Sequence, residues 1–108
     1  MVSYFSRQII EYVWQKAATV EGYNPDFWRK DFASAWIRRD LYGKQQMFGW
    51  VIDHKKPIAE GGTDDVSNLQ ALQWENNRKK GDDYPAFYTA LVSEDNKNVK
   101  KEQSWEVK

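Results

Sequence analysis

The segment VIDHKKPIAEGGTDDVSNLQALQWENNRKKGD, residues 51–82, decides the expected fold and holds the only histidine of the chain, His54. Residues 48–53 are mostly aromatic and β-branched, and the proline shortly after the histidine cannot donate a hydrogen bond within a sheet. A first strand should therefore stop just after His54. A second strand is expected to start near residue 69, and the charged segment that follows should form one or two helical turns before Gly81. The expected order is strand, strand, helix.

Apolar residues near the N-terminus recur at helical spacing within residues 6–18, and they form one stripe: Ile9, Ile10, Val13, Trp14, Ala17 and Ala18. This pattern predicts an amphipathic helix with Ser6 as its N-cap. The Asn-Pro-Asp sequence that follows is typical of a restart, so a second helix or turn is expected over about residues 25–34. A strand-like piece should follow around residues 36–37, with a turn near Gly43.

The C-terminal part contains two segments with β-strand composition, residues 86–92 and 102–107. The Asn-rich stretch between them, residues 93–101, predicts that they pair as a hairpin. With 108 residues and 12.8 kDa, the chain has the length of one domain. We expect a single domain over residues 1–108, with its core motif at about 48–82.

The composition limits the chemistry. There is no cysteine, so disulfides and thiolate zinc sites are excluded. The formal net charge is zero, but residues 28–56 hold seven basic and three acidic residues, which predicts a local cationic surface beside the histidine. The N-terminus lacks a signal-peptide pattern and no segment approaches a membrane span. A cytoplasmic protein with no membrane contact is expected.

Four polar residues stand at a recognisable spacing. Asp53 directly precedes His54, Asn68 lies fourteen positions after the histidine, and Asn77 lies nine positions after Asn68. This layout resembles the HNH endonuclease family, whose core is the ββα-metal motif of two strands and a helix, and the resemblance covers residues 48–82. It implies a ββα-metal finger, and together with the N-terminal helix or helices and the C-terminal hairpin predicted above, the expected fold is α+β.

The resemblance also implies a role for each of these residues. His54 would be the general base that takes a proton from the attacking water, and Asp53 and Asn77 would be the protein ligands of a divalent ion. Asn68 would hydrogen-bond to backbone near the base and keep the imidazole aimed. An imidazole titrates near neutral pH, which suits a general base. Taken singly, each residue also has a plain local explanation, such as a strand-end histidine or an Asx-turn.

Geometry sets two conditions on this site. Neighbouring strand residues point to opposite faces, so Asp53 and His54 can serve one site only at a bulge or a strand end. Consecutive helical residues point about 100° apart, so only one of Asn76 and Asn77 can face the metal, and the spacing selects Asn77.

Basic residues near the motif are candidate nucleic-acid contacts: Lys55, Lys56, Arg78 and Lys80. Lys80 lies three residues after Asn77, on nearly the same helix face, where its ammonium could meet a phosphate. The alternative for residues 78–80 is a solvated helix end that complements the helix dipole.

The donor set favours Mg²⁺ or Mn²⁺ over Zn²⁺, because one carboxylate and one amide leave the remaining coordination to water and substrate oxygens. Gln73 and Asn76 stand where zinc-stabilised members of the family carry a cysteine pair, so no structural zinc is expected. Tryptophan packing should stabilise the finger instead, with Trp36, Trp50 and Trp74 as candidates.

Three functional hypotheses follow. The first is a metal-dependent HNH endonuclease that hydrolyses phosphodiester bonds, with DNA favoured over RNA. The second is a nucleic-acid-binding module that keeps the ββα shape without turnover. The third is a ribonuclease or toxin-like nuclease that needs an inhibitor partner; the sequence names no protein partner.

Overall fold

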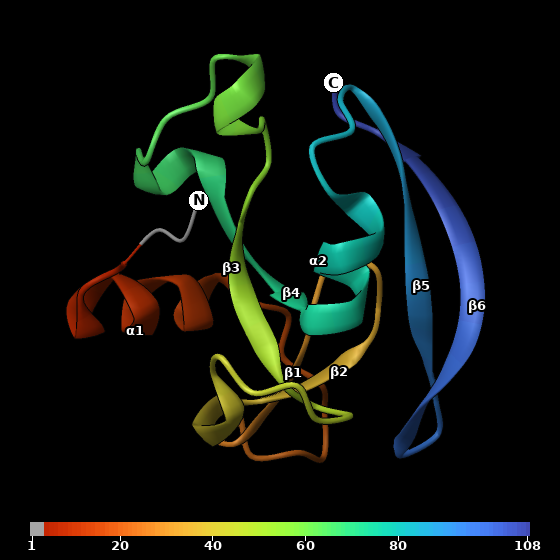
Figure 1. Ribbon diagram of the computed structural model, residues 1–108. Coiled ribbons are helices and arrows are strands. Elements are labelled where there is room, and N and C mark those ends of the chain that lie inside the picture. Colours follow the sequence, from red (N-terminus) through yellow and green to blue (C-terminus); the bar gives the residue numbers. More distant parts are fainter. Residues whose placement is uncertain (1–3) are drawn as a thin grey trace.

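The computed structural model describes residues 4–108, which form a mixed helix and strand structure with two α-helices and three small antiparallel sheets (Figure 1). The elements in chain order are α1 (Arg7–Lys16), β1 (Trp28–Lys30), β2 (Trp36–Arg38), β3 (Trp50–His54), β4 (Leu69–Gln73), α2 (Trp74–Lys80), β5 (Ala86–Glu94) and β6 (Lys97–Glu106). Within these residues, no helix is long and apolar enough to cross a membrane.

The helix α1 begins where the sequence predicts. Ser6 is its N-cap, and the side-chain oxygen of Ser6 accepts a hydrogen bond from the Ile9 amide at 3.1 Å. The buried face of the helix carries Val13 and Trp14, both 0% exposed, which pack in the core with Leu69 of β4. The apolar stripe therefore anchors the N-terminal part of the chain to the central strands.

Of the two alternatives expected over residues 25–34, the helix is absent and the turn is present at 25–27. The strand β1 follows and pairs with β2, with Arg29 opposite Ile37. The buried guanidinium of Arg29 donates to backbone carbonyls at the end of α1, which ties the segment to that helix in an extended form. These long-range contacts override a weak local preference for helix.

The strands β3 and β4 pair antiparallel, and α2 starts at the residue after β4. The pairing is regular to the end of β3, with Asp53 opposite Gln70 and His54 opposite Leu69. The structure therefore contains no bulge at residues 53–54, and of the two expected arrangements only the strand end is present. The side chain of Gln73 caps α2 by accepting hydrogen bonds from the first helical amides.

The C-terminal hairpin is present, but its strands are longer than the sequence predicts. β5 and β6 pair from Ala86 opposite Glu106 to Glu94 opposite Lys97, with one register shift near Thr89. The expected loop over 93–101 is mostly strand, because Asn98 is drawn into the interior. Its side chain accepts from the Trp36 amide at 2.7 Å and donates to the Trp36 carbonyl at 3.0 Å.

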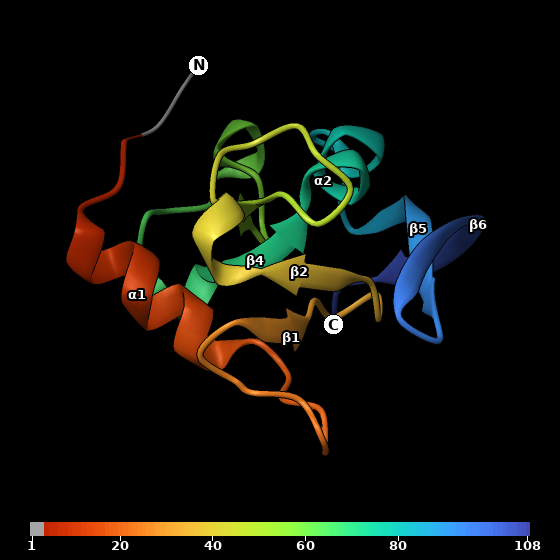
Figure 2. The same ribbon diagram turned by 90° about the horizontal axis from the view of Figure 1, so that it is seen from below.

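Viewed from below, α1 lies at one end of the molecule and the β5–β6 hairpin lies at the other, with the short sheets and α2 between them (Figure 2). The core cluster contains residues from α1, β2, β3 and β4: Val13, Trp14, Ile37, Trp50, Ile52, Leu69 and Ala71. Of the three expected tryptophans, Trp36 and Trp50 are buried, whereas Trp74 is only half-buried.

Gln73 and Asn76, which stand where zinc-stabilised members of the family carry a cysteine pair, belong to a buried network of hydrogen bonds. Asn76 is 0% exposed; its oxygen accepts from the Leu91 amide at 2.7 Å, and its nitrogen donates to Asp31 at 3.0 Å. The same carboxylate accepts from the Gln73 amide at 2.9 Å. Hydrogen bonds between amides, a carboxylate and backbone therefore join α2 to β5 and to the segment before β2.

Candidate functional site

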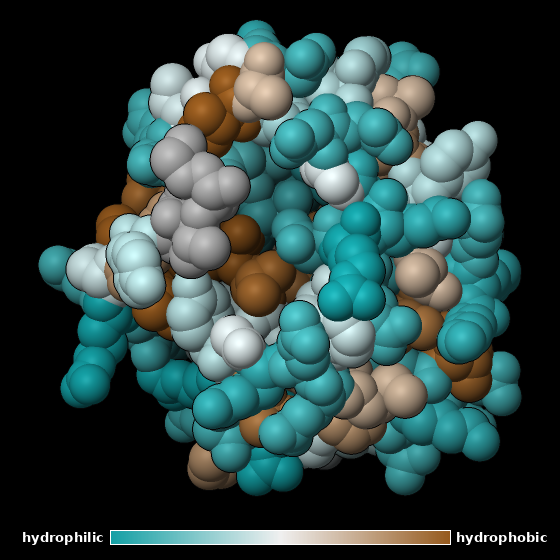
Figure 3. All heavy atoms as spheres, viewed as in Figure 1, coloured by the Kyte–Doolittle hydropathy of each residue, from teal (hydrophilic) through white to brown (hydrophobic). Residues whose placement is uncertain are grey.

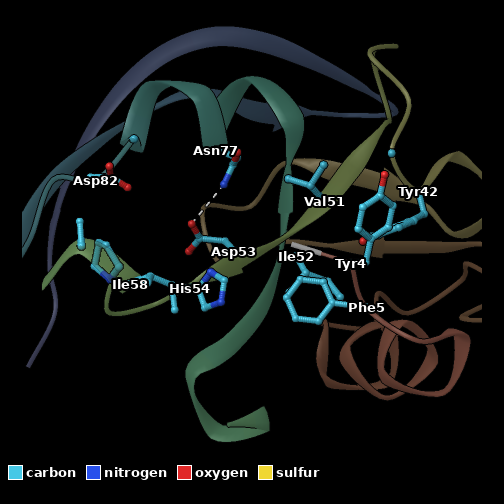
Figure 4. Close-up of a pocket in the computed structure, with 14 residues that line it drawn as sticks. Tyr4, Phe5, Tyr42, Val51, Ile52, Asp53, His54, Ile58, Asn77 and Asp82 are labelled. Carbon is cyan, nitrogen blue, oxygen red and sulfur yellow. Dashed lines mark hydrogen bonds between the residues drawn. The ribbon is translucent and has the colours of Figure 1, made fainter. Parts of the chain in front are cut away.

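A cavity of about 860 Å³ opens at the end of β3, between α2 and the segment before α1. Its lining combines a polar group, Asp53, His54, Asn77 and Asp82, with aromatic and aliphatic side chains that include Phe5, Tyr42, Ile52 and Ile58 (Figure 4). On the face seen in Figure 1, hydrophobic side chains lie among mainly hydrophilic ones (Figure 3). The cavity brings three of the four predicted site residues together, and only Asn68 is outside its lining.

Asp53 is buried, with 4% of its surface exposed, and three side chains donate to its carboxylate. Gln70 donates to Oδ2 at 2.9 Å, Asn77 donates to Oδ1 at 3.2 Å, and the Lys80 ammonium lies 3.3 Å from Oδ1. Burial raises the pKa of Asp53 above its usual range, while the charge of Lys80 and these hydrogen bonds act in the opposite direction. The carboxylate is thus held firmly in one orientation.

His54 is the last residue of β3, and its ring is held on the side facing the N-terminal segment. Its Nε2 lies 2.7 Å from Oδ1 of Asp64, and its ring centroid is 6.0 Å from that of Phe5. When Nε2 carries the proton donated to Asp64, Nδ1 is the acceptor nitrogen of the ring. The side chain is 15% exposed, so the imidazole is both restrained and accessible.

Asp53 and His54 both line this cavity although β3 contains no bulge at these residues. Figure 4 shows Asp53 directed toward Asn77 of α2, with His54 on the other side of the ribbon near Phe5. The side chains keep the alternation of a regular strand. Both nevertheless line the same cavity.

Asn68 fastens the loop that follows His54. Its side-chain oxygen accepts from the Lys56 amide at 2.9 Å, and its nitrogen donates to the carbonyls of Lys56 at 3.0 Å and Thr63 at 2.8 Å. The Asn68 carbonyl accepts from the Lys55 amide at 2.8 Å. These bonds hold the start of the loop beside His54 and its far end beside Asp64.

The structure separates the roles of the two consecutive asparagines. Asn77 faces Asp53 and the cavity, whereas Asn76 points into the interior toward β5. The spacing in the sequence and the geometry of α2 therefore select the same residue to face the carboxylate.

The four basic candidates lie in different environments. Arg78 and Lys56 are exposed, with Arg78 over the Trp74 ring at 4.9 Å and Lys56 near the Tyr84 ring at 5.8 Å. Lys55 is half-buried. Lys80, expected at a phosphate, is only 1% exposed and its ammonium is directed at Asp53 and at the His54 carbonyl.

Two site residues, Asp64 and Gln70, are absent from the sequence-based prediction. Asp64 lies in the loop between the two strands, and no spacing rule connects it to His54. Gln70 had a signal, because the antiparallel register that pairs His54 with Leu69 places Gln70 opposite Asp53.

The oxygen atoms of Asp53 and Asn77 are ligands of the kind that an open site for a hard cation uses. Within residues 4–108, no three residues of the types His, Cys, Asp and Glu gather in a way that could hold a metal ion. The cavity offers the Asp53 carboxylate and the Asn77 amide, and half a turn of that amide exchanges its nitrogen for its oxygen. Two oxygen donors with space for water and phosphate oxygens fit a hard divalent ion and do not fit a closed zinc site.

Of the polar residues that line this cavity, Asp53, His54 and Asn77 lie in the part of the chain from β3 to the end of α2, and Asp82 follows two residues after that helix. Comparison with curated proteins and with solved structures found no match for the chain. Residues 43–83, which contain β3, β4, α2 and every one of the four predicted site residues, match the model of the HNH endonuclease family, and this match indicates a nuclease-type function.

Proposed function

We propose that this protein is a divalent-metal-dependent endonuclease that hydrolyses phosphodiester bonds, with DNA as the favoured substrate. The observation that carries the proposal is the convergence of a restrained imidazole and a buried carboxylate on one cavity, within the segment that matches the HNH family. The proposed acting unit is a single domain over residues 1–108.

In this proposal His54 is the general base. Its ring takes a proton from the water that attacks the phosphorus, and Asp64 holds the ring and stabilises the imidazolium that forms. Asn68 is a positioning residue, because it fixes the backbone on both sides of the loop between His54 and Asp64. The 15% exposure of the imidazole lets water reach it.

Asp53 and Asn77 are the residues that would hold the divalent ion, with Mg²⁺ or Mn²⁺ favoured by their oxygen donors. When bound, the ion supplies neutralisation of charge on the phosphate and on the leaving oxygen. Gln70 orients the carboxylate from the opposite strand by donating to Oδ2.

The exposed cations near the cavity are proposed to contact the phosphate backbone. Lys56 directly precedes the lining residue Pro57, and Arg78 directly follows the lining residue Asn77, so both are neighbours of the cavity lining along the chain. Lys55 is the third candidate. Contacts of this kind strengthen binding without reading base sequence, and they weaken as salt concentration rises.

The test is cleavage of a supercoiled plasmid by the purified chain in Mg²⁺ or Mn²⁺, with EDTA and the His54→Ala variant as controls. Nicked or linear DNA that forms only with the ion and only with His54 supports the proposal. The same reactions with a structured RNA distinguish a ribonuclease, and expression in a growing culture tests for toxicity.

A binding module without turnover is the second candidate, and the tight packing around Asp53 favours it, since three donors already surround the carboxylate. It predicts a mobility shift of the nucleic acid with no product under any ion, and that result would replace the enzymatic proposal.

A further inference from the structure

A buried lysine contacts the carboxylate of the candidate site. Lys80 is 1% exposed and Asp53 is 4% exposed, and the ammonium of the first lies 3.3 Å from Oδ1 of the second. The ammonium also donates to the His54 carbonyl at 2.9 Å, and it lies 5.2 Å from the centre of the Phe87 ring of β5. A full positive charge is therefore enclosed next to the carboxylate that would hold a cation.

The position of Lys80 follows from α2. It is the last residue of the helix and lies three residues after Asn77, so both side chains extend from one face toward Oδ1 of Asp53. Gln70 donates to the other oxygen. A carboxylate has about four lone-pair positions, and three donors leave roughly one of them for any further partner.

We infer that Lys80 is an internal counter-ion that competes with the divalent cation for Asp53 and thereby sets the cation affinity of the site. This inference rests on the proposed function and adds a residue that controls it. Without a cation, Lys80 balances the buried carboxylate, which would otherwise be an unpaired buried charge. When a cation binds, the ammonium and the cation are like charges within one small enclosed volume, and they repel each other.

The charges of Asp53, Lys80 and a phosphodiester predict that the cation binds tightly only when substrate is also present. Asp53 carries one negative charge, and Lys80 cancels it before any divalent ion arrives. A phosphodiester brings a negative charge into the cavity and offsets part of the added positive charge. The arrangement therefore couples cation binding to nucleic-acid binding through electrostatics alone.

The test compares Lys80→Met with the wild-type protein in two measurements that do not depend on cleavage. Calorimetric titration with Mn²⁺ gives the affinity of the nucleic-acid-free protein, and thermal unfolding is followed in EDTA and in Mn²⁺. Lys79→Met is the matched control, because the neighbouring lysine is exposed and its ammonium points toward Glu102 at 3.8 Å. Asp53→Asn combined with Lys80→Met removes both charges.

We expect Lys80→Met to bind Mn²⁺ roughly tenfold or more tightly than wild type, because a like charge has been removed from the site. Its melting temperature should fall in EDTA and recover in Mn²⁺, since an ion that binds only the folded state stabilises it. Lys79→Met should match wild type in both measurements. The double variant should lose the response to Mn²⁺, because the carboxylate is gone.

Mn²⁺ affinity in Lys80→Met that is equal to or weaker than that of wild type would overturn the inference. If Lys80→Met is unfolded in EDTA, refolding on addition of Mn²⁺ supports the competition, and failure to refold in Mn²⁺ while the double variant folds overturns it. The proposed function is judged separately, by plasmid cleavage with wild type and His54→Ala. Wild-type cleavage without a gain of affinity in Lys80→Met would reject this inference alone.

Discussion

At the end of β3, the two side chains of the candidate site are held by residues from other segments. His54 is restrained by Asp64 of the following loop, and Asp53 is restrained by Gln70 of the partner strand and by Asn77 of α2. Such outer contacts fix the orientation of acids, bases and ligands, and they leave the core packing unaffected. Changes at single site residues should therefore alter chemistry more than stability.

His54→Ala should lower the rate of nucleic-acid cleavage by roughly 100-fold or more, as loss of a general base typically does. The fold should persist, because His54 is only half-buried and lies outside the core cluster. Initial cleavage rates and the circular dichroism spectrum check the two parts. Wild-type activity with an unchanged pH profile in this variant would remove His54 from the mechanism.

Asn77→His should shift the ion preference of the site toward Ni²⁺, Co²⁺ or Zn²⁺, because it places an imidazole nitrogen beside Asp53. The gain should disappear as the pH falls through the imidazole pKa, since only the neutral ring binds metal. Calorimetric titrations with Ni²⁺ and Mg²⁺ at several pH values measure this. Arg78→His, on the exposed next position, is the control, and an equal gain there would show that Asn77 does not face the ion.

At the scale of elements, α2 contacts the candidate site with one face and the interior of the fold with the other. One face presents Asn77 and Lys80 to Asp53, while Asn76 and the capping residue Gln73 bind the interior. Hydrogen bonds between the Asn76 side chain and the backbone of β5 hold α2 against that strand, and every buried side-chain nitrogen and oxygen in residues 4–108 has a partner. A polar network that is fully satisfied in this way rigidifies the contact between elements.

Asn76→Ala should lower the free energy of unfolding by about 3 kcal/mol or more, because it leaves buried partners without a hydrogen bond. The stranded groups would be the amides of Ala90 and Leu91 and the carbonyl of Leu91. Urea denaturation followed by tryptophan fluorescence gives the difference. The control is Lys79→Ala on the exposed face of the same helix, and an equally small effect at both positions would contradict the structural role of the network.

Asp31→Asn should destabilise the protein most at acidic pH. Burial raises the pKa of Asp31, although hydrogen bonds from the Gln73 and Ala35 amides and from the Asn76 side chain act in the opposite direction. The folded state therefore keeps this proton to a higher pH than the unfolded chain does, so the contribution of Asp31 to stability decreases as pH rises from the ordinary aspartate pKa through the raised one.

The difference in the free energy of unfolding between wild type and Asp31→Asn should accordingly decrease as pH rises from the ordinary aspartate pKa through the raised one. Denaturation curves for both proteins between about pH 4 and pH 7 test it, starting near the ordinary aspartate pKa. A difference that widens with pH would mean that Asp31 is stabilised in its charged form.

For the whole molecule, the helix α1 and the β5–β6 hairpin enclose the central ββα segment from opposite ends (Figure 2). The core is built from aromatic and aliphatic residues, with Trp14 and Trp50 packed at a centroid distance of 5.4 Å. Large aromatic side chains bury much apolar surface in a chain of this length.

The fold should therefore be insensitive to chelators. Addition of EDTA is expected to leave the circular dichroism spectrum and the melting temperature unchanged, because the chain has no cysteine and a single histidine from which to build a closed structural site. Loss of the spectrum after chelation would show that a metal ion holds the fold together.

Local patterns in the sequence were sufficient to predict α1, the order β3, β4 and α2, and the existence of the C-terminal hairpin. Ser6, Pro57 and Gly81 mark boundaries through backbone chemistry that acts within a few residues, so the sequence alone locates them. The choice of Asn77 over Asn76 also follows from spacing.

Tertiary structure decided what depends on contacts between distant segments. Residues 28–30 form a strand and not a helix because they pair with β2 and because the Arg29 side chain binds backbone carbonyls at the end of α1. Residues 97–101 belong to β6 because the Asn98 side chain binds the Trp36 backbone. The partnership of Asp64 with His54 and the burial of Lys80 beside Asp53 have the same origin. Each of these contacts forms only because the tertiary fold brings the two residues close together. Local sequence patterns act over a few residues and cannot predict which side chains will meet in this way.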